Sequence, residues 1–456
     1  MTYFDLFYKT LAAQNIDNKT NKLVPLQFYA KNYLEFYSQL HSYAQTYKLN
    51  KFIVLTDGIP KKSTLENETD ICDILSHNLN LNLEFISLPH AHASEFYLQK
   101  LIDILSQKQD HCGFIALGSG SITDLMKHAL FLMDKNDAQF ISVPTATTVT
   151  AFTSAFSVVD ISGAKRTRIS KNINATFWIE PLLKAAPISL TRAGFGDLLA
   201  RFVAYGDWYL GSTLNMFDNY DEIALRLMEP FSDFLKSSEL QNTELLTQTL
   251  AMAGVSMSLC NQTTPLSGYE HVISHGLDFL RLSSKRVLVL HGEQVSLSTL
   301  SSAMSYEWLL EQNEFNIKNF RTLNEKEAKT LIHKLLTNAP FMDEEKRDLT
   351  KVSEIFLQDY LEKNEKWNET KNNFNQFIEA WPQIKIRLKQ LVLPSNEIEQ
   401  ILKKMELPLF PESTNPTTTA LEYRWAMRFA PFVRSRFCLA DFIFWIGEDP
   451  CAIASL

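Results

Sequence analysis

Apolar residues recur in two different patterns along this chain, one over roughly the first 190 residues and another after them. Short runs rich in β-branched and aromatic residues predict buried strands at 51–58, 83–88, 113–117 and 139–144. Helical patterns separate these runs, so we expect βαβ units and a parallel sheet. The run after Phe156 and the run that leads to Trp178 are expected to form a hairpin around Ser162-Gly163.

The second pattern, apolar residues at helical spacing with few strand signals, begins after Pro187. It predicts helices over Leu198–Leu210, Glu222–Leu235, Glu244–Leu259 and Tyr269–Leu280. We therefore expect an α/β domain over residues 1–186, with a parallel sheet, and an all-helical domain over residues 187–456.

The stretch from about residue 338 to residue 412 is rich in Lys, Glu and Asn, which would suit a linker. Apolar residues nevertheless keep helical spacing there, namely Phe374, Phe377, Trp381, Ile384 and Leu388. We interpret this stretch as extra helices on the outside of the helical domain.

Net charge, cysteine spacing and the length of apolar runs indicate which partners and which cellular compartment to expect. The formal net charge of -8 argues against a general binder of nucleic acid or of membrane surfaces, although a local basic pocket remains open. The five cysteines include no CxxC pair, which is typical of reduced thiols. No apolar run approaches the roughly 20 residues that span a bilayer. We expect a cytoplasmic protein that forms a homo-oligomer.

A glycine-containing turn, Gly118-Ser119-Gly120-Ser121, lies between a predicted strand and a helix that starts near Ile122. Glycines let the backbone approach a pyrophosphate, and a helix N-terminus offers free N–H groups to it. Asp124 could bind a nucleotide hydroxyl or simply favour the helix dipole. A tight strand-to-helix turn without a ligand is the alternative for the whole motif.

Two further segments at strand ends are candidates for nucleotide contacts. Asp57 follows the first strong strand and could accept hydrogen bonds from an adenosine ribose, or cap the local turn. Thr145 and Thr148 follow Pro144, in a hydroxyl-rich loop at a strand's carboxyl end. Such threonines could contact phosphate or ribose, or satisfy their own turn.

Three potential metal ligands, Asp197, His271 and His291, are spread through the middle of the chain. One carboxylate and two imidazoles leave an open position on a divalent cation, as catalytic sites require. The glycine before Asp197 predicts a bend that starts a helix, with the carboxylate on its first turn. Any single histidine is more often structural, but the joint pattern favours a site.

Two more residues are candidates for substrate chemistry. His275 is four positions after His271, so the two share a helix face, and it could support a ligand or handle protons. Lys165, in Ser162-Gly163-Ala164-Lys165, could meet a substrate phosphate or be a solvated hairpin residue.

Taken together, these segments resemble the iron-containing alcohol dehydrogenase and dehydroquinate synthase superfamily, and most of all its glycerol-1-phosphate dehydrogenase branch. The resemblance is carried by five segments in order: Gly118 to Asp124, Val143-Pro144-Thr145-Ala146, Gly194 to Asp207-Trp208, Ser267 to His275, and His291-Gly292-Glu293-Gln294-Val295. Near the end, Val433-Arg434-Ser435-Arg436-Phe437 is similar to that branch's Arg-x-Arg-aromatic segment.

The resemblance implies an N-terminal domain that binds NAD or NADP and a helical domain that binds one divalent metal, zinc or iron, with the cleft between them as active site. By motif match, Asp197, His271 and His291 take the metal positions. Our candidate for the proton route is His275 or a metal-bound water, and Lys165 and Arg436 could pair with a substrate phosphate.

Three departures from the family pattern bear on the substrate. Ser119 replaces the second glycine of the turn. Thr150 stands where the family commonly has an Asp in the substrate pocket, which removes a hydrogen-bond acceptor for a polyol hydroxyl. The helices from about 338 to 412 lengthen the chain and could reshape the cleft mouth or form a subunit interface.

Three hypotheses of function follow. The first is a metal-dependent dehydrogenase that interconverts a small phosphorylated or polyhydroxylated alcohol and its ketone, using NAD or NADP. The second is a cyclase or lyase like dehydroquinate synthase, in which NAD is used catalytically and no net reduction occurs. The third is a binding or scaffold protein that has kept the fold.

Overall fold

The protein is described here by a computed structural model that covers residues 3–17, 20–78, 81–108, 112–217, 219–315, 322–341, 348–371 and 374–454. By its contacts the chain divides into two compact units that alternate along the sequence. The sheet unit comprises Met1–Ile161, Lys165–Phe195 and Ile223–Thr263, and the helical unit comprises Ser162–Ala164, Gly196–Glu222 and Thr264–Leu456. The boundary predicted between residues 186 and 187 stays a prediction.

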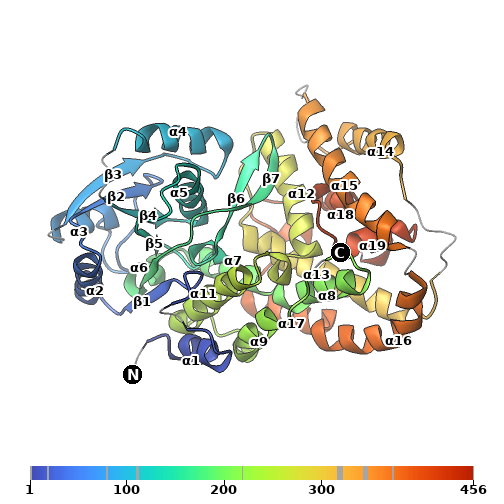
Figure 1. The fold of residues 1–456 in the computed structure, drawn as a ribbon, viewed down its shortest axis with the longest axis horizontal. Coiled ribbons are helices and arrows are strands. Elements are labelled where there is room, and N and C mark those ends of the chain that lie inside the picture. The colour runs from blue at the N-terminus through green and yellow to red at the C-terminus, as the bar shows by residue number, and fades with distance from the viewer. Residues whose placement is uncertain are drawn as a thin grey trace. The chain divides into compact units, whose positions relative to one another are not determined.

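The sheet unit contains a six-stranded parallel sheet with the strand order β1-β8-β5-β4-β2-β3. Strands β1 to β5 are labelled in Figure 1. Its strands are β1 (Leu26–Ala30), β2 (Lys51–Thr56), β3 (Asn82–Ser87), β4 (Gly113–Gly118), β5 (Phe140–Pro144) and β8 (Ala175–Ile179). The parallel sheet and the four predicted strands are confirmed as β2 to β5. The strand signal of β1 was missed.

Alternate side chains of the strands enter two apolar cores, one on each face of the sheet. Phe52 and Val54 face the core formed with α2 (Tyr33–Thr46) and α3 (Ile71–Asn78). Ile53 and Leu55 face the core formed with α4 (Glu95–Leu105) and α5 (Gly120–Leu132). Burial of both faces explains why these strands read as continuous apolar runs.

A separate two-stranded sheet is formed by β6 (Phe156–Ile161) and β7 (Ala164–Ile169). Ser162 and Gly163 connect them with φ values of 53° and 90°, as tight hairpin turns require. The predicted hairpin position is therefore correct, but its second strand is not the run to Trp178. That run is β8, which lies between β1 and β5 in the sheet. Every residue in it is buried, as expected for an inner strand.

Helices α1 (Asp5–Ala13), α6 (Glu180–Ala185) and α11 (Thr243–Leu259) also belong to the sheet unit. The predicted helix over Glu244–Leu259 is confirmed as α11. The prediction of one helix over Glu222–Leu235 is wrong, because that stretch divides into α9 (Ile223–Met228), a 3-10 turn and α10 (Ser232–Ser237). Pro230 lies in the turn and lacks the N–H that a continuous helix would use.

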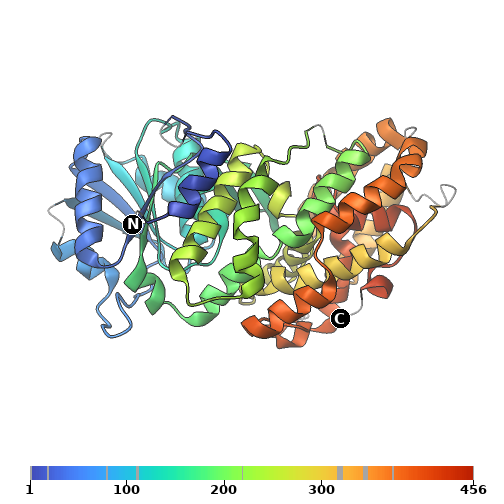
Figure 2. The same cartoon turned by 90° about the horizontal axis from the view of Figure 1, so that it is seen from below.

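The helical unit is built from α8 (Arg201–Thr213), α12 (Tyr269–Ser283), α13 (His291–Glu311) and the later helices, which are yellow to red in Figure 2. The predicted extra helices are present as α15 (Thr350–Thr370), α16 (Phe374–Leu391) and α17 (Ser395–Met405). All five apolar residues singled out in α16 are buried. Residues 342–347 and 372–373 of the predicted stretch lie outside the described residues.

Within the described ranges, none of the helices combines the length and the apolar character that crossing a bilayer requires.

Candidate active site

Asp197 lies in the last turn of α7 (Ile188–Leu198), so the prediction that it starts a helix is wrong. The helix begins after Pro187, and its two glycines are accommodated within it rather than ending it. A Cβ on Gly194 would lie 1.6 Å from the carbonyl oxygen of Thr147, and a Cβ on Gly196 would lie 2.4 Å from that of Gly292. Both glycines therefore lie where another backbone segment approaches α7 closely. The next helix, α8, starts at Arg201.

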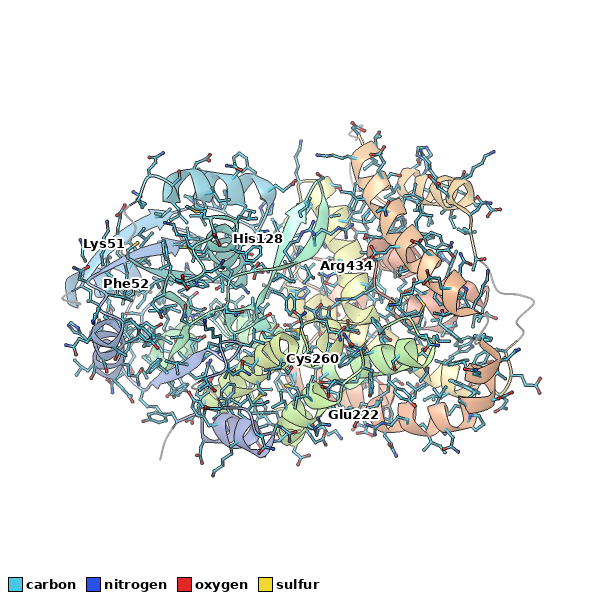
Figure 3. The ribbon with its side chains drawn as sticks, in the orientation of Figure 1. Lys51, Phe52, His128, Glu222, Cys260 and Arg434 are labelled. Atoms are coloured by element: carbon cyan, nitrogen blue, oxygen red, sulfur yellow. The ribbon has the colours of Figure 1, made fainter. Side chains whose placement is uncertain are left out.

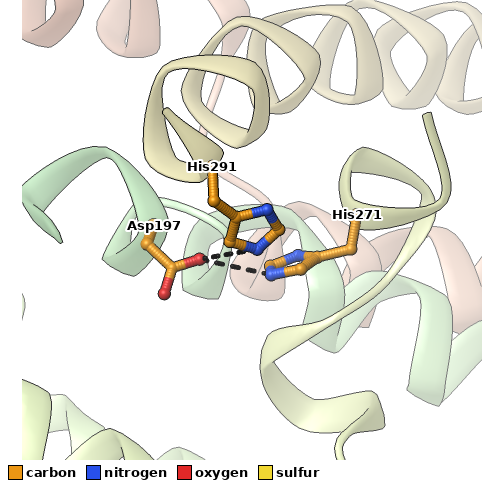
Figure 4. A group of neighbouring side chains, drawn as sticks. All are labelled: Asp197, His271 and His291. Atoms are coloured by element: carbon orange, nitrogen blue, oxygen red, sulfur yellow. Dashed lines mark ion pairs between the residues drawn. The ribbon is translucent and has the colours of Figure 1, made fainter. Parts of the chain in front are cut away.

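His271 and His291 come from two other helices and meet Asp197. His271 is in the first turn of α12, and His291 is the first residue of α13. Their Nε2 atoms lie 3.3 Å and 3.5 Å from Asp197 Oδ1 (Figure 4). One possible ligand atom from each of the three residues falls within 4.8 Å of the others. All three belong to the helical unit, and the structure brings together the set that the sequence singled out.

The opposite ring nitrogen of His271 faces a carboxylate. His271 Nδ1 lies 2.9 Å from Glu270 Oε1, which also accepts a hydrogen bond of 2.6 Å from Gly268 N. The start of α12 is held by Asp207, whose Oδ2 accepts from Tyr269 N at 2.6 Å. Burial, with a contribution from Glu270, raises the pKa of Asp207 to about 8.

His291 is fixed by two polar residues. Ser274 Oγ donates to Gln294 Oε1 at 2.7 Å and therefore accepts from His291 Nδ1, which is 3.2 Å away. With the proton of each imidazole held at Nδ1, the Nε2 lone pairs of both histidines are directed at the Asp197 carboxylate. Three acceptor atoms that face one another are stabilised by a cation between them, so the residues present fit a divalent metal.

The electrostatics of His271 agree with this fit. Burial lowers the pKa of His271, but the neighbouring carboxylates of Asp197 and Glu270 outweigh burial, so the pKa is raised overall. The site thus favours positive charge at this position.

His275 lies on the same helix but is not in the three-residue set. Its Nε2 is 2.9 Å from Arg434 Nη2, in the segment between α18 (Ala420–Val433) and α19 (Leu439–Trp445); Figure 3 labels Arg434. A guanidinium is only a donor, so Nε2 must accept and the proton of a neutral His275 sits on Nδ1. Its ring centre is 6.2 Å from that of His291.

Arg436, two residues further on, is half-buried and donates to Ser267 Oγ at 2.5 Å. Burial lowers its pKa, while Glu270 and Asp207 act in the opposite direction. The sequence motifs included Arg434, Glu270, Ser274 and Gln294, but no role was predicted for any of them. The signal that could have found the last three is their position one or three residues from a predicted ligand.

The glycine-containing turn in the sheet unit has the predicted form. Strand β4 ends at Gly118 and α5 begins at Gly120. A Cβ on Gly120 would lie 2.5 Å from Val149 Cγ2, so a larger residue there would have to displace the Val149 side chain. Thr145 N donates to Gly118 O at 3.2 Å. Nearby, the buried hydroxyl of Thr148 has no hydrogen-bond partner among the residues described, which leaves it able to bind a ligand.

The two predicted aspartates are engaged elsewhere. Asp124 pairs with buried Lys127 at 3.1 Å and accepts from Val158 N at 3.2 Å, and it lies beyond the first turn of α5. Asp57 accepts from Ile59 N at 3.0 Å and pairs with Lys61. Both carboxylates have local partners, which favours the structural alternative for each.

Thr150 and Lys165 also lie in the sheet unit. Thr150 opens a 3-10 turn (Thr150–Phe152), whose first carbonyl oxygen would be 2.6 Å from a Cβ on Gly254. Lys165 is a half-buried residue of β7 whose charge acts on His92 and on Asp124.

Comparisons with known proteins agree with this arrangement. The iron-containing alcohol dehydrogenase family model matches residues 35–179. The chain is 32% identical over 284 residues to the glycerol-1-phosphate dehydrogenase (NAD(P)+) of Bacillus subtilis, covering 58% of this chain and 71% of that protein. It is 32% identical over 200 residues to the enzyme of the same name from Halalkalibacterium halodurans, covering 42% of this chain and 49%, about half, of that relative.

Among solved structures, an iron-containing alcohol dehydrogenase from Corynebacterium glutamicum has the same fold. The TM-score is 0.53 at 11% identity, and the match covers 95% of this chain and 98% of that one.

Proposed function

Because this chain belongs to the iron-containing alcohol dehydrogenase family, we propose that it is a metal-dependent NAD(P)-linked dehydrogenase that interconverts a small phosphorylated polyol and its ketone. Its relatives' name suggests the pair glycerol 1-phosphate and dihydroxyacetone phosphate. The observation that carries the proposal is the convergence of Asp197 Oδ1 with the Nε2 atoms of His271 and His291. The Nδ1 atom of each histidine has a hydrogen-bonding partner of its own.

The residues of the helical unit take distinct roles in this reaction. Asp197, His271 and His291 hold the divalent cation, zinc or iron. When bound, the cation would stabilise an alkoxide as a Lewis acid, and NAD(P) would carry the hydride. His275 holds its proton at Nδ1 because Arg434 occupies Nε2, so Nδ1 is the atom from which we propose the proton moves.

Substrate phosphate is proposed to pair with Lys165 and Arg436. The guanidinium of Arg436 stays charged at any physiological pH and is anchored on Ser267. Arg434 adds a positive charge that is buried, two residues away. The cofactor is proposed to use the Gly118–Ser121 turn together with Thr145 and Thr148. Asp57 and Asp124 support these loops through their local contacts.

The test is oxidation of NADH and of NADPH by dihydroxyacetone phosphate, before and after treatment with a chelator. We expect cofactor consumption in proportion to ketone, loss of activity with chelator, and recovery with zinc or ferrous iron. Lack of turnover across a panel of ketose and ketone phosphates, in protein that binds metal and NADPH, would overturn the proposal. Turnover with catalytic NAD and no net oxidation would instead identify a dehydroquinate synthase-like cyclase.

The proposed enzyme acts on small molecules in the cytoplasm as a homo-oligomer. None of its five cysteines, all of which lie in the described ranges, forms a disulfide, which suits a reducing compartment. Light scattering on the purified protein measures its oligomeric state.

A further inference from the structure

One lysine of α15 is buried in the middle of the helical unit. The side chain of Lys363 is 3% exposed. Its Nζ donates to Asp441 Oδ1 at 2.6 Å and to the carbonyl oxygen of Pro431 at 2.7 Å. A buried ammonium is retained only where charge and hydrogen bonds compensate for lost hydration, and these two partners supply both.

The two partners of Lys363 lie on either side of the Arg-x-Arg segment. Pro431 is in the last turn of α18, and Asp441 is in the first turn of α19. Asp441 Oδ2 also accepts from Cys438 N at 2.8 Å, which caps α19. Lys363 therefore joins the end of one helix to the start of the next.

The connection that Lys363 closes is short and carries both arginines, of which Arg434 is buried and Arg436 half-buried. Residues 434–438 connect the two helices, and from them Arg434 reaches His275 while Arg436 reaches Ser267. Moving either helix end would move these guanidinium groups relative to α12, which carries His271.

Aromatic contacts support the same arrangement. Tyr360 packs against Phe432 with ring centres 5.3 Å apart, and Trp367 stacks on Trp445 at 4.3 Å. These contacts place one turn of α15 on each side of Lys363 against α18 and α19. The apolar contacts hold α15 in place, while the ammonium fixes the two helix ends relative to each other.

We propose that Lys363 is a positioning residue that holds Arg434 and Arg436 in register with the candidate active site. It contacts neither the metal ligands nor His275, so it acts through the segment it closes. The helices over 338–412, which lengthen this chain, would thus stabilise the candidate active site through the segment between α18 and α19. That the segment receives substrate phosphate rests on the proposed function.

The test compares Lys363→Met with the double variant Lys363→Met/Asp441→Asn, which leaves no uncompensated buried carboxylate. Hydrogen exchange of the backbone amides of residues 434–438 is measured by mass spectrometry, without substrate. We expect exchange to rise roughly tenfold or more in both variants, the size expected for a lost hydrogen bond to a charged group. The double variant regains thermal stability but keeps the faster exchange, because the bond to Pro431 stays absent.

Val352→Ala is the matched control, since Val352 is buried near the start of α15 and far along the helix from Lys363. It lowers stability without accelerating exchange at 434–438. In steady-state kinetics, both Lys363 variants raise the KM for dihydroxyacetone phosphate more than they lower kcat, and Val352→Ala changes neither.

Unchanged exchange at 434–438 in the folded double variant, or an equal rise in Val352→Ala, would overturn the role of Lys363. The exchange result needs no turnover. Wild-type protein that fails to reduce dihydroxyacetone phosphate therefore contradicts the proposed function alone.

Discussion

At the scale of single residues, the candidate metal site depends on which ring nitrogen of each histidine carries the proton. Glu270 fixes this for His271, and the pair Ser274 and Gln294 fixes it for His291. Removing such outer partners typically costs 10- to 100-fold in metal affinity, because the ring can then turn or change tautomer.

Ser274→Ala should therefore weaken metal binding by roughly tenfold or more, with little change in stability. The hydroxyl that accepts from His291 Nδ1 is lost, so its Nε2 lone pair is no longer held toward Asp197. Competition with a metallochromic chelator measures the affinity. Ser302→Ala is the control, since Ser302 is buried on α13 and its hydroxyl has no partner within the described chain. Equal affinity in the two variants would contradict the account.

At the scale of elements, the site requires three helix ends to converge closely. Gly196 permits this, because α7 approaches the start of α13 so closely that a Cβ would meet the carbonyl of Gly292. His291 precedes Gly292 and Asp197 follows Gly196, so this approach sets the distance between two of the proposed ligands.

Gly196→Ala should lower both stability and metal affinity. In an unhindered helix, alanine would instead gain about 1 kcal/mol over glycine. The clash with backbone costs about 1–3 kcal/mol, and it separates Asp197 from His291. Thermal unfolding and metal titration check the two effects. Gly276→Ala on α12 is a milder comparison, since its nearest neighbour is the side chain of Ala426 at 3.2 Å. A Gly196→Ala protein that gains stability would refute the close approach.

The contrast between α7 and the strands shows what the sequence could predict. The strands β2 to β5 were predictable because both faces of a parallel sheet are buried, which leaves continuous apolar runs. The continuation of α7 to Leu198 was not, because Gly194 and Gly196 look like helix breakers until their neighbours are known. Likewise, Pro230 marked the break between α9 and α10, but apolar spacing carried across it and hid the break.

The site divides along similar lines. Asp197, His271 and His291 were predictable because residue type and motif order both point to them. Arg434 and Lys363 were not, because their roles depend on contacts across 159 and 78 positions of the chain, with His275 and Asp441. Asp57 and Asp124 had two predicted roles each, and only their hydrogen-bond partners favour the structural one.

At the scale of the whole molecule, the two compact units carry different parts of the proposed chemistry. The sheet unit contains the Gly118–Ser121 turn and Lys165, and the helical unit contains the metal set and both arginines. Neither part alone accounts for a dehydrogenase. Because the three metal ligands lie in the helical unit, substituting one of them changes no residue of the sheet unit or of its cofactor turn.

The most direct test of the account is a metal titration of chelator-treated protein, wild type and Asp197→Asn, with bound metal and NADPH oxidation by dihydroxyacetone phosphate measured on the same samples. We predict that wild-type activity rises in proportion to one tightly bound metal ion per chain. Asp197→Asn should bind NADPH normally but neither hold the metal tightly nor turn over. Wild-type metal content and activity in Asp197→Asn would contradict the assignment of this site.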